Sequence, residues 1–163
     1  MSVRILLADD HRIVRDGLRS LLSQQPGFVI VGDVASGRDA VRLAAEVAPD
    51  VVIMDIRMAD MNGIEATRQI IRNCAKTRVI ALSMCFDKQS VDEMIRAGAS
   101  GFLVKDCSFQ ELVEAVRAVA GGGYYLSPKM THVVVDSLRQ SKRRGTSSAY
   151  SALTDREREV LQL

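Results

Sequence analysis

The chain has 163 residues, of which 47% are apolar and 26% charged, the balance of a globular protein with one domain and a short appendage. No segment approaches the roughly 20 apolar residues of a membrane span, and the first 20 residues are too charged for a signal peptide. The net charge of +2 is too small to predict a nucleic-acid surface over the whole chain. Cys74, Cys85 and Cys107 lack metal-ligand spacing, so we expect free thiols in a reducing cytoplasm.

Short apolar runs alternate with segments of helical periodicity along most of the chain. The predicted strands are 4–8, 28–34, 51–54, 78–83 and 101–104. The predicted helices are 11–25, 37–47, 63–73, 88–98 and 108–123, the last with Ser108 as its N-cap. Strict alternation of strand and helix predicts an α/β fold: a doubly wound, five-stranded parallel sheet with helices on both faces.

The pattern changes after residue 123. We expect one more helix from Pro128 to about Gln140, and residues 141–152 have the polar and basic composition of a linker. Another helix begins at Thr154, where Glu157 completes a capping box, and the sequence ends within it. A helix of about ten residues with an apolar stripe is not stable alone. The pattern therefore predicts three segments: a domain over 1–123, a helix and linker over 124–152, and a truncated second domain over 153–163.

Charged and hydroxyl side chains follow four of the five predicted strands. Asp9 and Asp10 follow the first strand, Asp55 the third, Ser83 the fourth and Lys105 the fifth. In an open parallel sheet, ligands bind outside the carboxyl ends of the strands, so these groups should meet there. Each alone has an ordinary interpretation as a turn residue, a helix-end charge or a surface lysine. Three carboxylates at one mouth, however, repel each other unless a cation neutralises them.

Phosphoryl transfer explains this combination of groups. Mg²⁺ prefers oxygen ligands and binds through one or two carboxylates, water and phosphate oxygens. A carboxylate can also act as a nucleophile and form an acyl phosphate, whose oxygens need a metal ion, an ammonium group and hydroxyl or amide donors around them. Asp55 is the best candidate for the nucleophile because its strand is expected at the centre of the group.

The constellation resembles the receiver domain of two-component response regulators over about residues 3–122. The matching motifs are "LLADDH", "VVIMDIRMADMNG", "ALS" and "GFLVKD", in the family's order and separations. The resemblance implies a flavodoxin-like strand order of 2-1-3-4-5 and phosphorylation of Asp55 by the histidine of a sensor kinase. It also implies that Mg²⁺ is bound directly by Asp10, by Asp9 more through water, by Asp55 and by the backbone carbonyl of Arg57.

The resemblance further implies which residues contact the phosphoryl group and how the domain responds to it. Ser83 and Lys105 would contact it, and Phe102 at the aromatic switch position would turn inward as Ser83 moves. For Phe102 taken alone, ordinary core packing is the better explanation. The surface formed by residues 88–123 would then repack, with homodimer formation as one outcome. Such a protein is not an enzyme, since it catalyses only its own phosphoryl transfer and dephosphorylation.

The C-terminal segment "LTDREREVLQL" is similar to the opening of the LuxR-type helix-turn-helix domain of NarL/FixJ-type regulators. This similarity implies a DNA-binding output domain that regulates transcription. Because such a domain needs about 60 residues, its recognition helix is missing here and no residue is assigned to reading bases.

Two positions depart from the family pattern. Ala59 stands where proline usually follows Met58, which frees the backbone φ of that loop without removing a ligand. Cys85 stands where many relatives have histidine, beside the expected site. The expected consequence is a change in phosphoryl lifetime or in access of the phosphoryl donor, with no direction predicted.

Three other functions fit parts of the pattern. A phosphatase of the haloacid dehalogenase class needs a second aspartate two positions after its nucleophile, where this chain has Arg57 after Asp55 and His11 after Asp9. A flavin-binding electron carrier needs a hydroxyl- and glycine-rich loop after the first strand, but "DDHRIVRDG" would repel a phosphate. A receiver that acts only through protein contacts is the third, and the C-terminal motif argues against it.

Overall fold

The structure is a computed structural model that describes residues 2–85 and 87–146. The predicted helix at Thr154 and the whole 153–163 segment lie outside these residues. The strands are β1 (Val3–Ala8), β2 (Phe28–Val34), β3 (Val51–Asp55), β4 (Arg78–Ser83), β5 (Gly101–Val104) and β6 (Tyr125–Leu126). The helices are α1 (Arg12–Ser23), α2 (Gly37–Val47), α3 (Gly63–Asn73), α4 (Lys88–Ala97), α5 (Phe109–Ala120) and α6 (Pro128–Thr146). Among the described residues, no helix combines the length and apolarity needed to cross a membrane.

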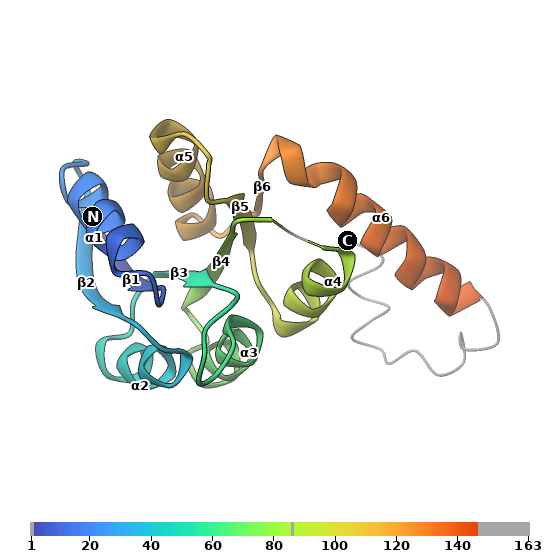
Figure 1. The fold of residues 1–163 in the computed structure, drawn as a ribbon, viewed down its shortest axis with the longest axis horizontal. Coiled ribbons are helices and arrows are strands. Elements are labelled where there is room, and N and C mark those ends of the chain that lie inside the picture. Colours follow the sequence, from blue (N-terminus) through green and yellow to red (C-terminus); the bar gives the residue numbers. More distant parts are fainter. Residues whose placement is uncertain (1, 86, 147–163) are drawn as a thin grey trace.

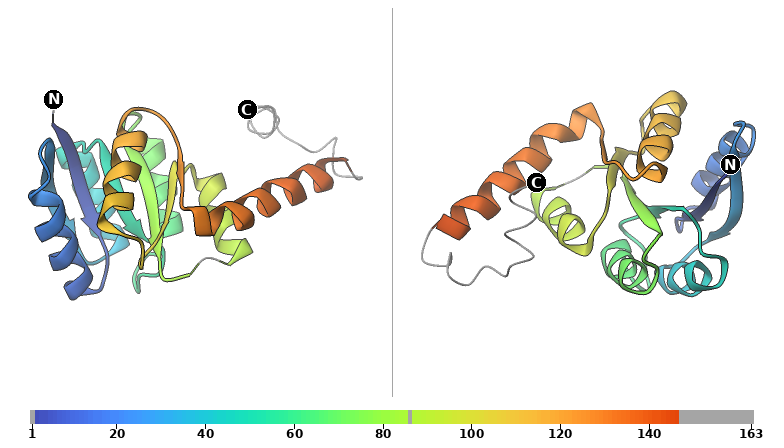
Figure 2. Two further views of the ribbon diagram at one scale, coloured as in Figure 1. Left: turned by 90° about the horizontal axis from the view of Figure 1, so that it is seen from above. Right: turned by 180° about the vertical axis from the view of Figure 1, so that it is seen from behind.

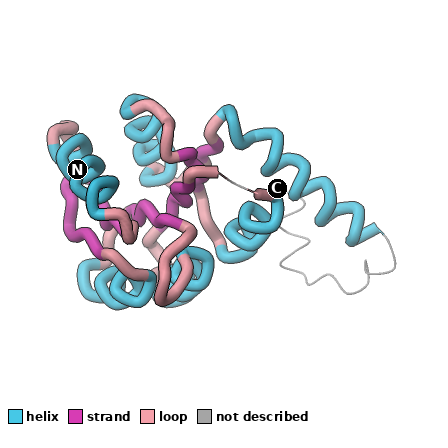
Figure 3. The backbone as a smooth tube through the Cα atoms, in the orientation of Figure 1, coloured by secondary structure: helices cyan, strands magenta, loops and turns pink. Residues whose placement is uncertain are grey.

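The sheet is parallel and its strand order is β2-β1-β3-β4-β5-β6. The predicted order of the first five strands agrees with this, but the predicted number of strands is wrong, because β6 pairs with β5 through Gly101↔Tyr125 and Phe102↔Leu126. Two residues after a glycine run are too short to give a strand pattern. Helices α1 and α5 cover one face of the sheet and α2, α3 and α4 the other (Figures 1 and 3).

Alternating side chains of the central strands fill the two halves of the core. Ile53 of β3 packs with α1 and α5, and its neighbour Met54 packs on the opposite face with α2 and α3. Both faces of β3 are buried, because side chains of a strand alternate between faces and both faces carry helices. This explains why the strand reads as a continuous apolar run, and it fixes where the chain emerges at Asp55.

Helix α6 continues past the predicted end near Gln140 to Thr146. Residues 141–146 have no apolar periodicity, but they include lysine and arginine, which are good helix formers. The first part of α6 lies beside α4 (Figures 1 and 2). Met130 and Val134 are buried there in one cluster with Phe102, Val91 and Met94. The start of α6 is therefore part of the folded core rather than a free connector.

Met130→Ala should lower the free energy of unfolding by about 2–4 kcal/mol, because it empties space in this cluster. Urea unfolding measures the effect. Lys129→Ala, one position earlier with a 70% exposed side chain, is the matched control and should change stability by no more than about 0.5 kcal/mol. Equal stability of the two variants would show that α6 does not contribute to the core.

Candidate functional site

Backbone hydrogen bonds continue the sheet by one residue at two places and so fix the charged groups at its edge. The Asp9 amide donates to the Val34 carbonyl at 3.1 Å, and the Lys105 amide donates to the Ser83 carbonyl at 2.7 Å. Asp55 is itself the last residue of β3 and pairs with Leu82 of β4. The parallel strands therefore deliver these three side chains to one edge, as the sequence predicts.

The Lys105 ammonium group lies between two carboxylates. Its Nζ is 2.9 Å from Asp9 Oδ2 and 3.5 Å from Asp55 Oδ1. All three side chains are at most 8% exposed. Buried charges are costly unless they are paired, and the loss of one partner leaves an uncompensated charge. Lys105 is thus the cation that makes it possible to hold Asp9 and Asp55 together away from water.

Burial and charge repulsion set the protonation of Asp55. Burial raises its pKa most, the negative charge of Asp9 adds to this, and Lys105 with the amide of Arg57 opposes it, so that the pKa is about 6 instead of 3.8. Asp55 Oδ2 is also buried without a hydrogen-bond partner among the described residues. A buried acceptor of this kind normally has a partner, so Asp55 presents an atom suited to bind a ligand.

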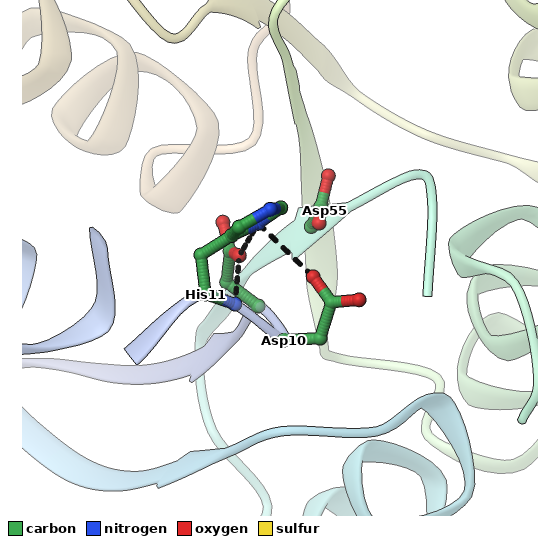
Figure 4. A group of neighbouring side chains, drawn as sticks. Asp10, His11 and Asp55 are labelled. Atoms are coloured by element: carbon green, nitrogen blue, oxygen red, sulfur yellow. Dashed lines mark hydrogen bonds and ion pairs between the residues drawn. The ribbon is translucent and has the colours of Figure 1, made fainter. Parts of the chain in front are cut away.

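Asp10 and His11 complete an acidic cluster at this edge of the sheet. The ligand atoms of Asp9, Asp10, His11 and Asp55 all lie within 4.8 Å of one another. Figure 4 shows the His11 ring turned toward the carboxylates, with Asp10 beside Asp55. Three carboxylates, among them the Asp55 group whose Oδ2 finds no hydrogen-bond partner in the described part of the chain, fit the oxygen-ligand preference of Mg²⁺. Asp9, Asp10 and Asp55 are therefore the residues that would hold this ion.

The loop between β3 and α3 folds back over the end of β3. The Gly63 amide donates to the Ile56 carbonyl at 2.7 Å, and a Cβ on Gly63 would lie 2.1 Å from the Asp55 carbonyl oxygen. Only glycine allows this approach. A cleft of about 500 Å³ opens beside the loop, lined by Asp10, residues 56–59, Asn62, Ile64 and Ser90. Ala59, where the family usually has proline, is thus in the wall of the cleft.

Asp60 anchors the same loop to the neighbouring helix. Its carboxylate accepts from the amides of Gly37 and Arg38 at 3.2 and 3.4 Å, at the N-terminus of α2. Desolvation raises its pKa, but hydrogen bonds from the amides of Met61, Gly37 and Arg38 outweigh this and lower it. This residue was not predicted from the sequence. In the sequence, Asp60 is one polar residue of a turn that also contains Asn62 and Gly63. This context does not reveal that its partners lie at the start of α2.

Three other predicted residues lie in β4, in β5 and in the loop after β3. The Ser83 hydroxyl donates to the Cys85 carbonyl at 2.9 Å. Phe102 is 3% exposed and already packs inward, so an outward position is not seen in this structure. The Arg57 side chain points outward, 74% exposed and 3.9 Å from Asp87. The switch role of Phe102, the phosphoryl contact of Ser83 and the metal contact of the Arg57 carbonyl stay predictions.

His11 is a neighbour of the carboxylates that was not assigned to the site from the sequence. Its amide and its Nδ1 lie 2.8 and 3.0 Å from Asp9 Oδ1, and Nδ1 is also 3.0 Å from Asp10 Oδ1. The available signal was its position directly after the aspartate pair. A histidine at that position can equally face solvent, so adjacency alone did not place its ring.

The family model of the response regulator receiver domain matches residues 5–117. The chain belongs to this family. Among similar proteins, the transcriptional regulatory protein LiaR of Bacillus subtilis (strain 168) is 39% identical, covering 99% of the receiver chain and 75% of LiaR. The transcriptional regulatory protein DegU of Brevibacillus brevis is 36% identical, over 99% of this chain and 74% of DegU.

Solved structures agree. A two-component response regulator of the LuxR family from Aurantimonas sp. SI85-9A1 is similar with a TM-score of 0.78 and 35% identity, over 83% of this chain and 97% of that one. The signal receiver domain of the putative response regulator NarL from Mycobacterium tuberculosis is similar with a TM-score of 0.71 and 33% identity, over 74% and 98%. The sequence resemblance to NarL-type receivers is thereby confirmed at the level of the family.

The raised pKa of Asp55 gives a pH-dependent stability. Protonated Asp55 favours the folded receiver, so this contribution is full below about pH 4 and is lost as the pH rises through about 6. Asp55→Asn removes this pH-dependent loss of stability, because asparagine does not ionise. In metal-free buffer, we expect it to raise the free energy of unfolding by roughly 1–3 kcal/mol at pH 7 and by much less at pH 4. Urea unfolding at both pH values measures this.

The matched control for this series is Asp106→Asn, at an exposed carboxylate one residue after Lys105. A stability difference between Asp55→Asn and the unmutated receiver that is the same at pH 4 and pH 7 would contradict the raised pKa.

Proposed function

We propose that this receiver is switched by phosphorylation of Asp55 by the histidine of a sensor kinase. The observation that supports this most directly is the buried Oδ2 of Asp55, which has no hydrogen-bond partner within residues 2–85 and 87–146 and lies beside Lys105 and the acidic cluster. With a pKa of about 6, Asp55 is mostly ionised at pH 7 and is available as a nucleophile. An Asp55 oxygen attacks phosphorus, the bond from phosphorus to the donor's histidine nitrogen breaks, and an acyl phosphate forms.

The charge of the transferred group has to be neutralised in place. Bound Mg²⁺ would supply Lewis-acid stabilisation of the phosphoryl oxygens. Asp9 and Asp10 would hold that ion, together with the Arg57 carbonyl. Lys105, already 3.5 Å from Asp55, would contact one phosphoryl oxygen, and Ser83 would contact another after leaving the Cys85 carbonyl.

A rearrangement at Ser83 and Lys105 would reach the surface through β5 and α4. Phe102 packs in the same cluster as Met94 of α4 and Met130 of α6. Repacking of this cluster in the phosphorylated state would change the position of α6. Helix α6 leads toward the LuxR-like motif, so we propose that a DNA-binding output domain after this receiver regulates transcription, with a homodimer as the phosphorylated form in the cytoplasm.

The alternatives have less support. In a phosphatase of the haloacid dehalogenase class, the position of Arg57 would carry the acid/base aspartate, and here the side chain is 74% exposed and turned toward Asp87. A small-molecule phosphatase is therefore not proposed, and the receiver would catalyse only its own phosphorylation and dephosphorylation. A receiver that acts through protein contacts alone would keep the same Asp55 chemistry and would differ only in the partner that reads the phosphorylated surface.

Intact-mass measurement after incubation with acetyl phosphate tests the phosphorylation. We expect one added phosphoryl group with Mg²⁺, none with EDTA, and none for Asp55→Asn. Asp106→Asn, at the exposed carboxylate beside Lys105, should behave like the unmutated chain. An adduct on Asp55→Asn, or one that forms equally well in EDTA, would refute the assignment of the site.

A further inference from the structure

His11 stands at a helix N-terminus that its side chain does not cap. It is the N-cap residue of α1, and its side chain makes no capping hydrogen bond. Serine, threonine, aspartate and asparagine are preferred there because their oxygens accept from the first amides of the helix. The His11 ring instead turns toward the Asp9 and Asp10 carboxylates (Figure 4).

The ring makes two polar contacts through a single nitrogen. Nδ1 lies 3.0 Å from an oxygen of Asp9 and 3.0 Å from an oxygen of Asp10. A ring nitrogen carries at most one hydrogen and can donate it well to only one of them. Asp9 Oδ1 already accepts the His11 amide at 2.8 Å. Nδ1 thus faces two carboxylate oxygens, and at most one of these contacts is a linear hydrogen bond.

The spacing is compatible with a shared metal ion. With bonds of about 2.1 Å, adjacent ligands lie about 3.0 Å apart in an octahedral shell and about 3.4 Å apart in a tetrahedral one, and the Nδ1–oxygen separations of 3.0 Å, which are also hydrogen-bond lengths, need to widen little for either. Asp55 Oδ2, in a side chain only 4% exposed, adds a buried oxygen with no hydrogen-bond partner in the described part of the chain. Asp55 and His11 belong to one group of ligand atoms within 4.8 Å.

We infer that His11 is a nitrogen ligand of this cluster and that it lets the site bind zinc-like first-row divalent cations in preference to Mg²⁺. Imidazole nitrogen suits Zn²⁺, Ni²⁺ and Cu²⁺, whereas Mg²⁺ takes oxygen ligands, so the ring discriminates between the two classes. The consequence is competition at the acidic site, because both classes of ion need the same carboxylates. The inference rests on the proposed function only in sharing Asp9, Asp10 and Asp55.

Long-range ¹H–¹⁵N NMR correlations of the histidine rings test this on the tag-free 163-residue chain. The chain has two histidines, and His132 is an internal control, since its ring is 86% exposed and 3.2 Å from Asp136 on α6. We expect stoichiometric Zn²⁺ to move the His11 Nδ1 resonance to a metal-bound position and to leave His132 in place. A tenfold excess of Mg²⁺ alone should not produce this shift.

Asp10→Asn keeps the reporting ring and removes a neighbouring ligand, so the Zn²⁺ concentration at the midpoint should rise by about 10-fold or more. The matched control Asp106→Asn should leave the midpoint unchanged. The inference is overturned if Zn²⁺ leaves His11 Nδ1 unshifted, shifts both histidines alike, or acts at an unchanged midpoint in Asp10→Asn.

Phosphorylation of the same preparation by acetyl phosphate and Mg²⁺ separates this inference from the proposed function. If the phosphoryl adduct forms while the His11 resonance stays in place with Zn²⁺, the inference about His11 is wrong and the proposed function stands. If the His11 resonance shifts with Zn²⁺ while no adduct forms, the nitrogen ligand is supported and the proposed function fails.

Discussion

The site depends on one buried cation between two carboxylates. Lys105 Nζ contacts Asp9 at 2.9 Å and Asp55 at 3.5 Å, and the three side chains come from the ends of β1, β3 and β5. Without a cation, the repulsion between the carboxylates would favour protonation or separation of the strand ends. Lys105 compensates only in part, because burial and Asp9 still raise the pKa of Asp55 to about 6. A metal ion and a phosphoryl group would therefore enter a site that already contains a buried ammonium group and two buried carboxylates.

Neighbouring loops and strands hold these side chains in position and connect them to the rest of the domain. Gly63 brings the start of α3 against the Asp55 backbone, and Asp60 fastens the intervening loop to α2. On the other side, β5 carries Lys105 at its end and Phe102 in its middle. Phe102 packs with Met130 of α6. Strand β5 therefore connects Lys105 with the cluster that α6 packs into, and this is the path that the proposed switch would use.

Much of this arrangement was predictable from the sequence, because it follows from strand ends. Apolar runs that stop at Asp9, Asp55 and Lys105 predict both a parallel sheet and the edge at which the charges meet. The distances were not predictable, since they depend on which oxygen faces Lys105. Strand β6 was missed because two residues carry no alternation. The end of α6 was misplaced because a polar, basic segment reads as a linker even when it stays helical.

The orientation of two side chains also lay beyond the sequence. The Ser83 hydroxyl donates a hydrogen bond to the Cys85 carbonyl, and this local bond could not be predicted from the spacing of residues in the sequence. The His11 ring contacts the carboxylates of Asp9 and Asp10 while its side chain stays 64% exposed, and no spacing in the sequence distinguishes this orientation from one without the contacts. The sequence shows glycine at positions 37 and 63 but not why glycine is needed there. In the structure, a Cβ at either position would clash with the backbone of Met61 or Asp55.

The most direct test of a phosphoryl site at this strand end is ¹⁹F NMR of the chain with Mg²⁺ and beryllofluoride, an analogue of the phosphoryl group. A carboxylate oxygen of Asp55 flanked by Lys105 and the acidic cluster should give bound fluoride signals that require Mg²⁺ and that disappear in Asp55→Asn. Bound signals that persist in Asp55→Asn, or none with the unmutated chain, would contradict the claim that this strand end is a site for a phosphoryl group.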